Sequence, residues 1–417
     1  MLVPDGVSSV HPEAAGLAAM AERLIASLPC RESVQVEGLA ISLRALEPAQ
    51  SGWVMKYLEP LSLDRSDEVS RRVDCASAYS DEFVLTAVRY LHTPGIETFD
   101  RSGRGDAPLR CAALSPDRTL YCDPAEGIVW VVDLEAGTIL QVHSSRTRFP
   151  PLVFARTVRG ALLGWLESRG WVSFHAGAVV TESGVWMIVG EAGAGKTSLI
   201  LGLMREGARF VANERLLVSL DGDRPRALGY PMAIAVGIGS ASQFPRLAEL
   251  INAPDPLLYP RNRYDTQRVA RTPRERRYRL HDKLQLLPEE IASRVGAAET
   301  VPGGFVDAIV VPSVSRHPVA LRASTLDRDA LRTVLEDNCM GVAEPGRQPT
   351  WLSPSGEASA HVDAEPLLVE GLLPVVATRC RYSLDHETPG RPLTECIADA
   401  LDSQVGDIRS GESRGMT

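Results

Sequence analysis

The sequence predicts a mixed α/β protein in which a phosphate-binding loop joins a buried strand to a helix, with a smaller α+β domain before it. The first observation is that the stretch 190–198 contains the pattern G-x-x-x-x-G-K-[ST] without a mismatch. The second is their setting. Residues 185–189 form an apolar run of strand formers, residues 197–206 have helical character, and Gly207 stands where a helix-ending glycine belongs. This context separates a phosphate-binding loop from a chance glycine-rich turn.

The loop residues predict the class of ligand. They are Gly190, Glu191, Ala192, Gly193, Ala194, Gly195, Lys196, Thr197 and Ser198. Backbone N–H groups in such a loop converge on phosphates, and the helix N-terminus adds its dipole. Lys196 would place a point charge on the β- and γ-phosphates, and Thr197 would offer its hydroxyl to Mg²⁺. We therefore expect ATP with Mg²⁺, while the motif leaves GTP or pyrophosphate open.

Composition narrows the class of protein. The chain has 417 residues, of which 44% are hydrophobic and 23% charged, so there is room for two or three domains. A net charge of −9 gives no reason to expect nucleic acid or an anionic membrane as partner. We see neither a transmembrane stretch nor a signal peptide. Seven dispersed cysteines without a C-x-x-C motif indicate reduced thiols, so we expect a cytoplasmic protein.

Patterns along the chain predict three segments. Residues 1–150 form the N-terminal α+β domain, residues 151–402 the phosphate-loop domain, and residues 403–417 a disordered tail. In the first segment we expect a helix at 11–28 and a β-meander between 120 and 142. Further strands are predicted at 53–57 and 83–88, among others. The second segment is expected to open with a helix at 153–168.

A second constellation follows the loop. Asn213, Glu214 and Arg215 form a polar triplet between two apolar pieces of the segment 209–218. In phosphate-loop domains a carboxylate at the end of a buried strand commonly faces Mg²⁺ or the attacking group. A polar turn between two strands would produce the same pattern, and spacing alone leaves both interpretations open.

The chain resembles the HPr kinase/phosphorylase superfamily, whose fold is related to that of phosphoenolpyruvate carboxykinase. The matching segments are Phe174-His175-Ala176-Gly177, the loop itself, residues 207–214, Gly229-Tyr230-Pro231-Met232 and His281-Asp282-Lys283-Leu284. The last two resemble the divergent HPr kinase-related branch found in biosynthetic clusters. The resemblance covers roughly 120–385 and leaves residues 1–115 without a counterpart.

The resemblance implies an ATP- and Mg²⁺-dependent kinase with a mixed-sheet domain and a hydroxyl acceptor on a small molecule or peptide. It puts Lys196 on the phosphates, Thr197 or Ser198 on Mg²⁺, and His175 near the phosphates. The paired acidic residues of the family fall at Asn213 and Glu214, so Glu214 alone would serve as base, metal ligand or both. The family often forms oligomers, which leaves a homo-oligomer open.

A basic segment at 261–283 is a further candidate for anion binding. With Asn213 and Arg215, we take Arg261 and Arg263 from it as candidate substrate-binding residues. A solvated surface would give the same pattern, and thin aromatic interleaving argues against nucleic acid.

Two other functions stay open. One is a P-loop ATPase or GTPase switch, for which residues 216–221, ending in Asp221, would supply the Mg²⁺ carboxylate. No N-K-x-D or L-S-G-G-Q signature supports that class. The other is a non-catalytic nucleotide-binding protein, which the amide at Asn213 suggests.

Overall fold

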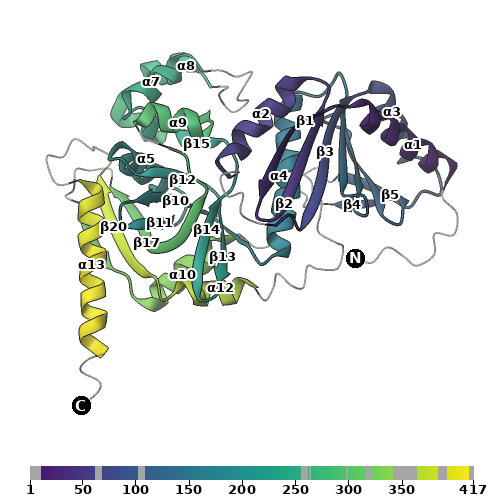
Figure 1. The fold of residues 1–417 in the computed structure, drawn as a ribbon. Coiled ribbons are helices and arrows are strands. Elements are labelled where there is room, and N and C mark those ends of the chain that lie inside the picture. The colour runs from purple at the N-terminus through teal and green to yellow at the C-terminus, as the bar shows by residue number, and fades with distance from the viewer. Residues whose placement is uncertain are drawn as a thin grey trace. The chain divides into compact units, whose positions relative to one another are not determined.

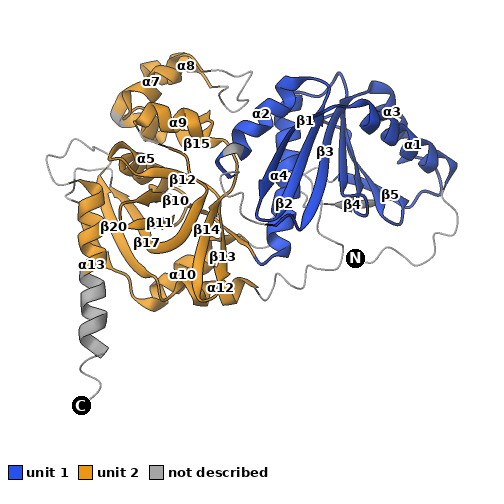
Figure 2. Ribbon diagram, in the orientation of Figure 1, with its two compact units in different colours: residues 1–170, 342–362 blue, residues 171–341, 363–417 orange. Residues whose placement is uncertain are grey.

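The chain divides into two compact units, one of residues 1–170 and 342–362 and the other of residues 171–341 and 363–417 (Figure 2). The computed structural model describes residues 11–61, 68–101, 109–254, 262, 264–296, 299–315, 319, 321–340, 364–383 and 392–412. Each unit has its own mixed sheet and its own hydrophobic core, so the predicted α/β class is confirmed.

The first unit alternates helices and strands before a run of antiparallel strands (Figure 1). Its helices are α1 (Pro12–Ser27), α2 (Pro48–Leu58), η1 (Glu59–Leu61), α3 (Asp81–Tyr90) and α4 (Pro150–Ser168). Its strands are β1 (Cys30–Val36), β2 (Leu39–Ala45), β3 (Arg71–Tyr79), β4 (Phe99–Arg101), β5 (Leu109–Ser115), β6 (Arg118–Asp123), β7 (Ile128–Asp133) and β8 (Thr138–His143).

The eight strands form one sheet in the order β1-β2-β3-β8-β7-β6-β5-β4, in which β2, β3 and β8 are parallel neighbours. Alternate side chains on a strand point to opposite faces. Val131 and Leu140 accordingly pack in one core cluster with α1 and α3. On the other face the indole N–H of Trp130 donates to the hydroxyl of Thr157 in α4, at 2.9 Å. Helices therefore cover both faces of this sheet.

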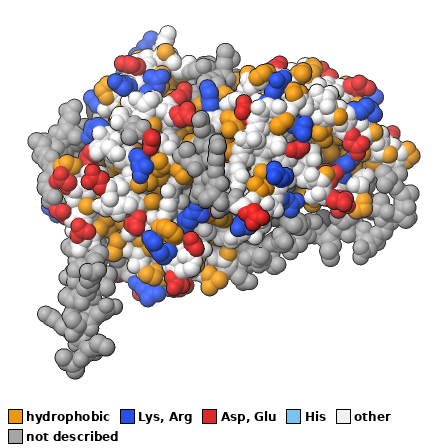
Figure 3. Space-filling view, in the orientation of Figure 1, with side chains coloured by type: hydrophobic (Ala, Val, Ile, Leu, Met, Phe, Trp, Pro, Cys, Tyr) orange, Lys and Arg blue, Asp and Glu red, His pale blue; other side chains and the backbone are white. Residues whose placement is uncertain are grey.

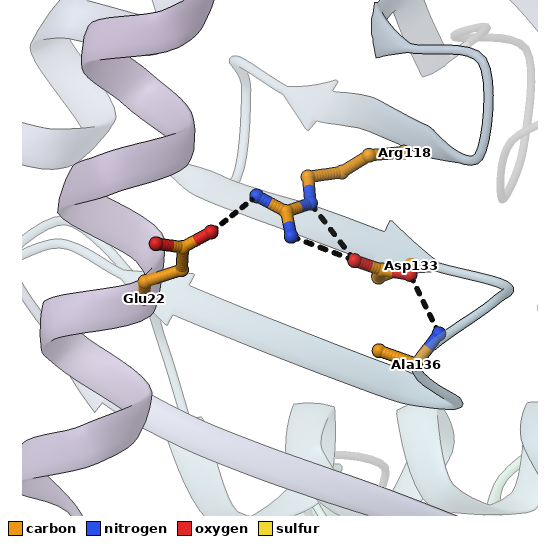
Figure 4. A network of polar contacts seen from close by, with 4 residues as sticks. All are labelled: Glu22, Arg118, Asp133 and Ala136. Carbon is orange, nitrogen blue, oxygen red and sulfur yellow. Dashed lines mark hydrogen bonds and ion pairs between the residues drawn. The ribbon is translucent and has the colours of Figure 1, made fainter.

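A polar network joins α1 to the β6–β7 hairpin (Figure 4). The Arg118 guanidinium bonds Glu22 Oε1 at 3.0 Å and, through Nη2, Asp133 Oδ2 at 2.7 Å. The other oxygen of Asp133 accepts the N–H of Ala136, in the turn between β7 and β8, at 2.8 Å. One arginine thus anchors a helix to a strand pair at the edge of the core.

The second unit carries the predicted loop. Its strands are β9 (Val172–Phe174), β10 (Ala176–Thr181), β11 (Gly184–Val189), β12 (Arg209–Ala212), β13 (Leu216–Asp221), β14 (Arg224–Gly229), β15 (Ile234–Gly237), β16 (Lys283–Leu286), β17 (Gly303–Ser315), β18 (Arg322–Thr325), β19 (Cys339–Met340) and β20 (Val376–Ser383). Its helices are α5 (Lys196–Arg205), α6 (Ile238–Ala241), α7 (Pro245–Asn252), α8 (Thr266–Arg271), η3 (Arg274–Arg279), α9 (Pro288–Val295), α10 (Arg328–Asn338), α12 (Ala364–Leu372) and α13 (Leu393–Glu412).

The long strand β17 organises the sheet of the second unit. Its first residues pair with β14 in an antiparallel arrangement, and the rest lies parallel to β11 on one side and β20 on the other. The sheet order is β12-β10-β11-β17-β14-β13-β9-β19, with β20 and then β18 alongside β17. A separate pair, β15 and β16, lies off this sheet. Three parallel strands, β11, β17 and β20, therefore end at one edge.

Both faces of this sheet are buried, as the alternation in β11 shows. Trp186 and Ile188 belong to a core cluster that includes α5, α7 and α9, whereas Met187 and Val189 pack in a second cluster with α10 and α12. Figure 1 shows α10 and α12 together, away from α5. A continuous apolar run is expected for a strand covered on both sides.

Some predicted elements differ from those observed. Residues 53–57 and 83–88, predicted as strands, lie in the helices α2 and α3. The helix predicted at 153–168 is present as α4, but it packs on the sheet of the first unit, so that unit extends to Gly170 and not to 150. Helix α13 ends at Glu412 and so enters the segment predicted as a tail. Within the described ranges, no helix combines the length and apolar character needed to cross a bilayer.

Candidate phosphate-binding site

Strand pairing brings the predicted site residues to one edge of the sheet. Strand β10 is antiparallel to both β11 and β12, with Ala176 opposite Val189 and Ala178 opposite Ala212. The residue before β10, the loop after β11 and the pair after β12 must therefore meet at the same edge. These are His175, residues 190–195 and the pair Asn213 and Glu214. Ligands of α/β sheets bind at the carboxyl ends of parallel strands, which is where this loop lies.

The loop is clamped by the C-terminal ends of β17 and β20. The N–H of Val314 donates to the carbonyl of Ala194 at 3.1 Å, and the Tyr382 hydroxyl donates to that of Gly195 at 2.6 Å. Gly195 has a φ of 103°, and a Cβ there would lie 2.5 Å from the Tyr382 hydroxyl. Only glycine fits this position. Burial raises the pKa of Tyr382 far above its ordinary value, so the hydroxyl stays protonated and able to donate.

Lys196 is buried at the first position of α5, with 7% of its surface exposed. Its ammonium donates to the carbonyl oxygens of Gly190 and, at 3.1 Å, Glu191. Burial lowers the pKa of Lys196 to about 8; the nearby Glu214 carboxylate opposes this fall and the Lys283 ammonium adds to it. A poorly solvated ammonium of this kind interacts strongly with an anion that reaches it.

The two hydroxyls that follow Lys196 have different surroundings. The Ser198 side chain is buried, and its Oγ lies 2.7 Å from the Oγ of Ser240 in α6. Thr197 is half-buried, and its hydroxyl makes no hydrogen bond to any residue in the described ranges. Thr197 is therefore the hydroxyl available to Mg²⁺, and Ser198 fastens α5 to α6.

Asn213 and Glu214 both carry polar atoms suited to a ligand. Asn213 is only 4% exposed, yet neither its Oδ1 nor its Nδ2 has a partner in the described part of the chain. A buried amide without partners costs free energy, of order 1–3 kcal/mol, unless something else satisfies it. Glu214 pairs with Lys283, with Oε1 and Nζ 3.3 Å apart.

His175 is bound to the backbone of this pair. Its ring Nδ1 lies 3.1 Å from the carbonyl oxygen of Glu214, and its backbone N–H donates to the backbone carbonyl of Asn338 at 2.7 Å. The ring is therefore placed to position Glu214. Arg215 follows Glu214 in the chain, and its guanidinium carbon lies 5.2 Å from the centre of the Tyr230 ring, over that ring. Its side chain is thus engaged in packing at a residue where we predicted substrate binding.

The basic segment is partly anchored. Arg268 pairs with Asp282, Arg274 donates to Gln243 at 2.6 Å, and Arg277 donates to Ser242 at 3.2 Å. Arg271, Arg276 and Arg279 are exposed. Arg261 and Arg263 lie outside the described residues. On the face drawn in Figure 3, basic and acidic side chains are interspersed over the described elements.

Asp221, the carboxylate of the alternative switch interpretation, lies far along β13 from this edge. Leu216 begins β13 opposite Phe174, the residue before His175, whereas Asp221 is exposed beside the turn that pairs it with Arg224. At ~3.3 Å per residue, five residues of strand separate the two ends by roughly 16 Å. Glu214, and not Asp221, therefore accompanies the loop.

The donor atoms at the edge suit a hard cation bound together with phosphates. They are oxygens: the Thr197 hydroxyl, the Glu214 carboxylate and the Asn213 amide. Among the described residues no group of three or more His, Cys, Asp or Glu side chains could hold a metal ion by itself. Mg²⁺ is commonly held by one or two protein oxygens plus phosphates and water, so this set fits it.

The sequence patterns did not identify Ser240, Val314 and Tyr382 as parts of the site, because each reaches the loop only through tertiary packing.

Comparison with known proteins adds no relative: no protein-family model matches the sequence, and no curated protein is significantly similar to it.

Proposed function

We propose that this chain is an ATP- and Mg²⁺-dependent kinase that transfers the γ-phosphate to a hydroxyl of a small molecule or peptide. The supporting observation is that a complete phosphate loop and the carboxylate Glu214 occupy one sheet edge, next to the Asn213 amide, which has no hydrogen-bond partner among the described residues. The proposal includes an HPr kinase-like fold for the second unit and a cytoplasmic location. It includes no nucleic acid or membrane partner.

In this proposal the loop amides and Lys196 bind the β- and γ-phosphates and offset the charge that develops on them. Glu214 orients the acceptor hydroxyl and takes its proton, while His175 holds the backbone of Glu214 in place. Thr197 and Glu214 would hold Mg²⁺, which neutralises phosphate charge when bound. The Asn213 amide is suited to hydrogen-bond the acceptor or a phosphate oxygen.

The test is Glu214→Ala, assayed with Mg·ATP against hydroxyl compounds and Ser/Thr peptides, with products followed by mass. We expect transfer to fall by about 10²- to 10⁴-fold, the usual contribution of a general base, while Mg·ATP still binds, at most about tenfold more weakly because one oxygen ligand of Mg²⁺ is lost. Asp221→Ala is the matched control, because it removes an exposed carboxylate at the far end of β13. Undiminished transfer by Glu214→Ala would disprove the base assignment.

The same assay separates the alternatives. A switch-type ATPase or GTPase would hydrolyse nucleotide without an acceptor and would be inactivated by Asp221→Ala. A non-catalytic binding protein would bind Mg·ATP and show neither activity. The amide at Asn213 is the observation that favours this last function, since an acidic residue stands there in the family that the sequence resembles.

A further inference from the structure

The chain has only three lysines among its 44 basic residues, and two of them, Lys196 and Lys283, lie at the phosphate-binding edge. The third, Lys56, is exposed in α2 of the first unit. Lys283 is not part of the loop motif. Its Nζ lies 3.3 Å from Glu214 Oε1, and its side chain is 49% exposed.

The position of Lys283 is fixed by the pieces around it. It begins β16 opposite Gly237, and the carbonyl of the preceding residue, Asp282, accepts the N–H of Ile238 at 3.1 Å. Ile238 starts α6, whose Ser240 bonds Ser198 in the loop helix. A short chain of hydrogen bonds thus connects the backbone of Lys283 to α5. The lysine is held near the phosphate loop by structure and not by charge alone.

The local charge balance suits a polyphosphate. The charges of Glu214 and Lys283 both act on the Lys196 ammonium, and Lys283 is paired with Glu214. These three side chains therefore place two ammonium groups and one carboxylate close together. A half-exposed ion pair such as Lys283–Glu214 contributes roughly 0–1 kcal/mol. A phosphate oxygen is a strong acceptor of charge-assisted hydrogen bonds. Moving the Lys283 ammonium from the carboxylate to a bound phosphate therefore costs little free energy.

We propose that Lys283 is a second phosphate-binding lysine and a catalytic residue. Its ammonium group pairs with Glu214 in the absence of nucleotide and with the γ-phosphate when the nucleotide is bound. This inference rests on the proposed function. It gives the exchange a purpose, because the Glu214 oxygen that was paired with Lys283 can then receive the acceptor hydroxyl.

The reaction step balances. The acceptor oxygen forms a bond to the γ-phosphorus, and the bond from that phosphorus to the bridging oxygen breaks. The electron pair leaves with ADP, and the hydroxyl proton goes to Glu214. Lys196 and Lys283 offset the negative charge on the transferred group, the role that an added cation fills in other phosphoryl transfers.

A simpler role for Lys283 predicts the opposite result. If Lys283 only neutralised Glu214, its removal would free the base, and transfer would stay the same or rise. If Lys283 contacts the γ-phosphate, its removal lowers the rate of transfer. It also weakens binding of ATP more than binding of ADP, which lacks that phosphate.

The first experiment labels lysines in the full wild-type chain with an amine-acylating reagent and follows each of the three sites by mass spectrometry. A non-hydrolysable ATP analogue with Mg²⁺ should slow labelling of Lys283 by about tenfold or more, since a charge-assisted bond to phosphate must first break. Mg·ADP should protect Lys196 and not Lys283, and Lys56 should react equally throughout. Equal labelling of Lys283 in all three conditions would overturn the proposal.

The second experiment measures single-turnover transfer and nucleotide affinity in Lys283→Met and Lys283→Arg, with Lys56→Met as the matched control. We expect Lys283→Met to lower the transfer rate by about 10²-fold or more, and Lys283→Arg to recover most of it. A wild-type rate in Lys283→Met refutes the catalytic role.

The two experiments also separate this inference from the proposed function. If the wild-type chain transfers phosphate to no acceptor while Lys283 is still protected by the ATP analogue and not by ADP, the kinase proposal fails and the phosphate contact holds. Far-UV circular dichroism checks that each variant folds.

Discussion

Adjacent residues at the start of α5 have separate tasks. The hydroxyl of Ser198 is occupied by Ser240, while that of Thr197 has no partner in the described ranges. The motif allows either to serve Mg²⁺, and only the packing of α6 against the loop helix distinguishes them. Lys196 shows the same dependence on packing, since its low pKa arises mainly from burial.

This difference leads to a prediction about the metal. Thr197→Ala should raise the Mg²⁺ concentration needed for half-maximal nucleotide binding by roughly tenfold, because one inner ligand is lost. Ser198→Ala should leave that concentration unchanged and lower the free energy of unfolding by about 1 kcal/mol through the lost bond to Ser240. Magnesium titrations and denaturant unfolding measure the two effects. A reversed pattern would assign the metal to Ser198.

Sequence patterns predict candidate site residues where the pattern is local. The glycine loop and Lys196 follow from a motif, whereas the role predicted for Glu214 is one that the family resemblance implies and that spacing alone leaves open. Two features do not follow from any local pattern, because both depend on which strands pair: the Asn213 amide, which lacks a partner in the described part of the chain, and the clamp from Tyr382. Arg215 shows the reverse: a charged residue beside the site that packs on Tyr230.

The C-terminal helix α13 is attached to the loop helix by one carboxylate. Glu206, just after α5, accepts the N–H groups of Leu393 and Thr394 and the Thr394 hydroxyl, each at 2.9 Å. These donors belong to the first turn of α13, where a helix has unpaired N–H groups and favours negative charge. Ile397 and Leu401 then bury against the same core as α5. Figure 1 shows α13 beside β20.

Glu206→Ala should therefore loosen α13 while the rest of the second unit stays folded. A lost helix cap costs about 1–2 kcal/mol, which corresponds to roughly 5- to 30-fold faster hydrogen exchange in the first turn of α13. Glu206→Gln keeps one oxygen acceptor and should fall between wild type and Glu206→Ala. Exchange at the wild-type rate in Glu206→Ala would show that apolar packing alone holds the helix.

The helix α3 shows why some elements were predicted incorrectly. Residues 83–88 are rich in apolar and β-branched side chains, which favours a strand. The structure buries Phe83, Val84, Ala87 and Tyr90, which recur at helical spacing, and Ser80 caps the first turn by accepting the N–H of Phe83 at 3.1 Å. The cap and the period outweigh local propensity here because the helix has a sheet face to cover.

The whole chain consists of two units with separate cores, and their boundary depends on tertiary contacts. The apolar pattern at 153–168 predicts a helix but cannot say which sheet the helix covers. The contacts of Thr157 answer this question. Its hydroxyl accepts the indole N–H of Trp130 and donates to the side-chain oxygen of Gln141 at 2.7 Å, and both partners lie on strands of the first unit. All the site residues belong to the second unit.

Nucleotide should therefore stabilise one unit selectively. In calorimetry of the full chain we expect two unfolding transitions. Mg·ATP at a concentration 100 times its dissociation constant should raise the free energy of unfolding of only one of the units, by about 2.7 kcal/mol. Lys196→Ala should abolish this shift. Arg118→Met removes the arginine bonds drawn in Figure 4. It should lower the free energy of unfolding of the first unit alone, by about 1–3 kcal/mol. A single transition that responds to both the nucleotide and Arg118→Met would mean that the two cores unfold as one, because a ligand bound to either unit then stabilises both.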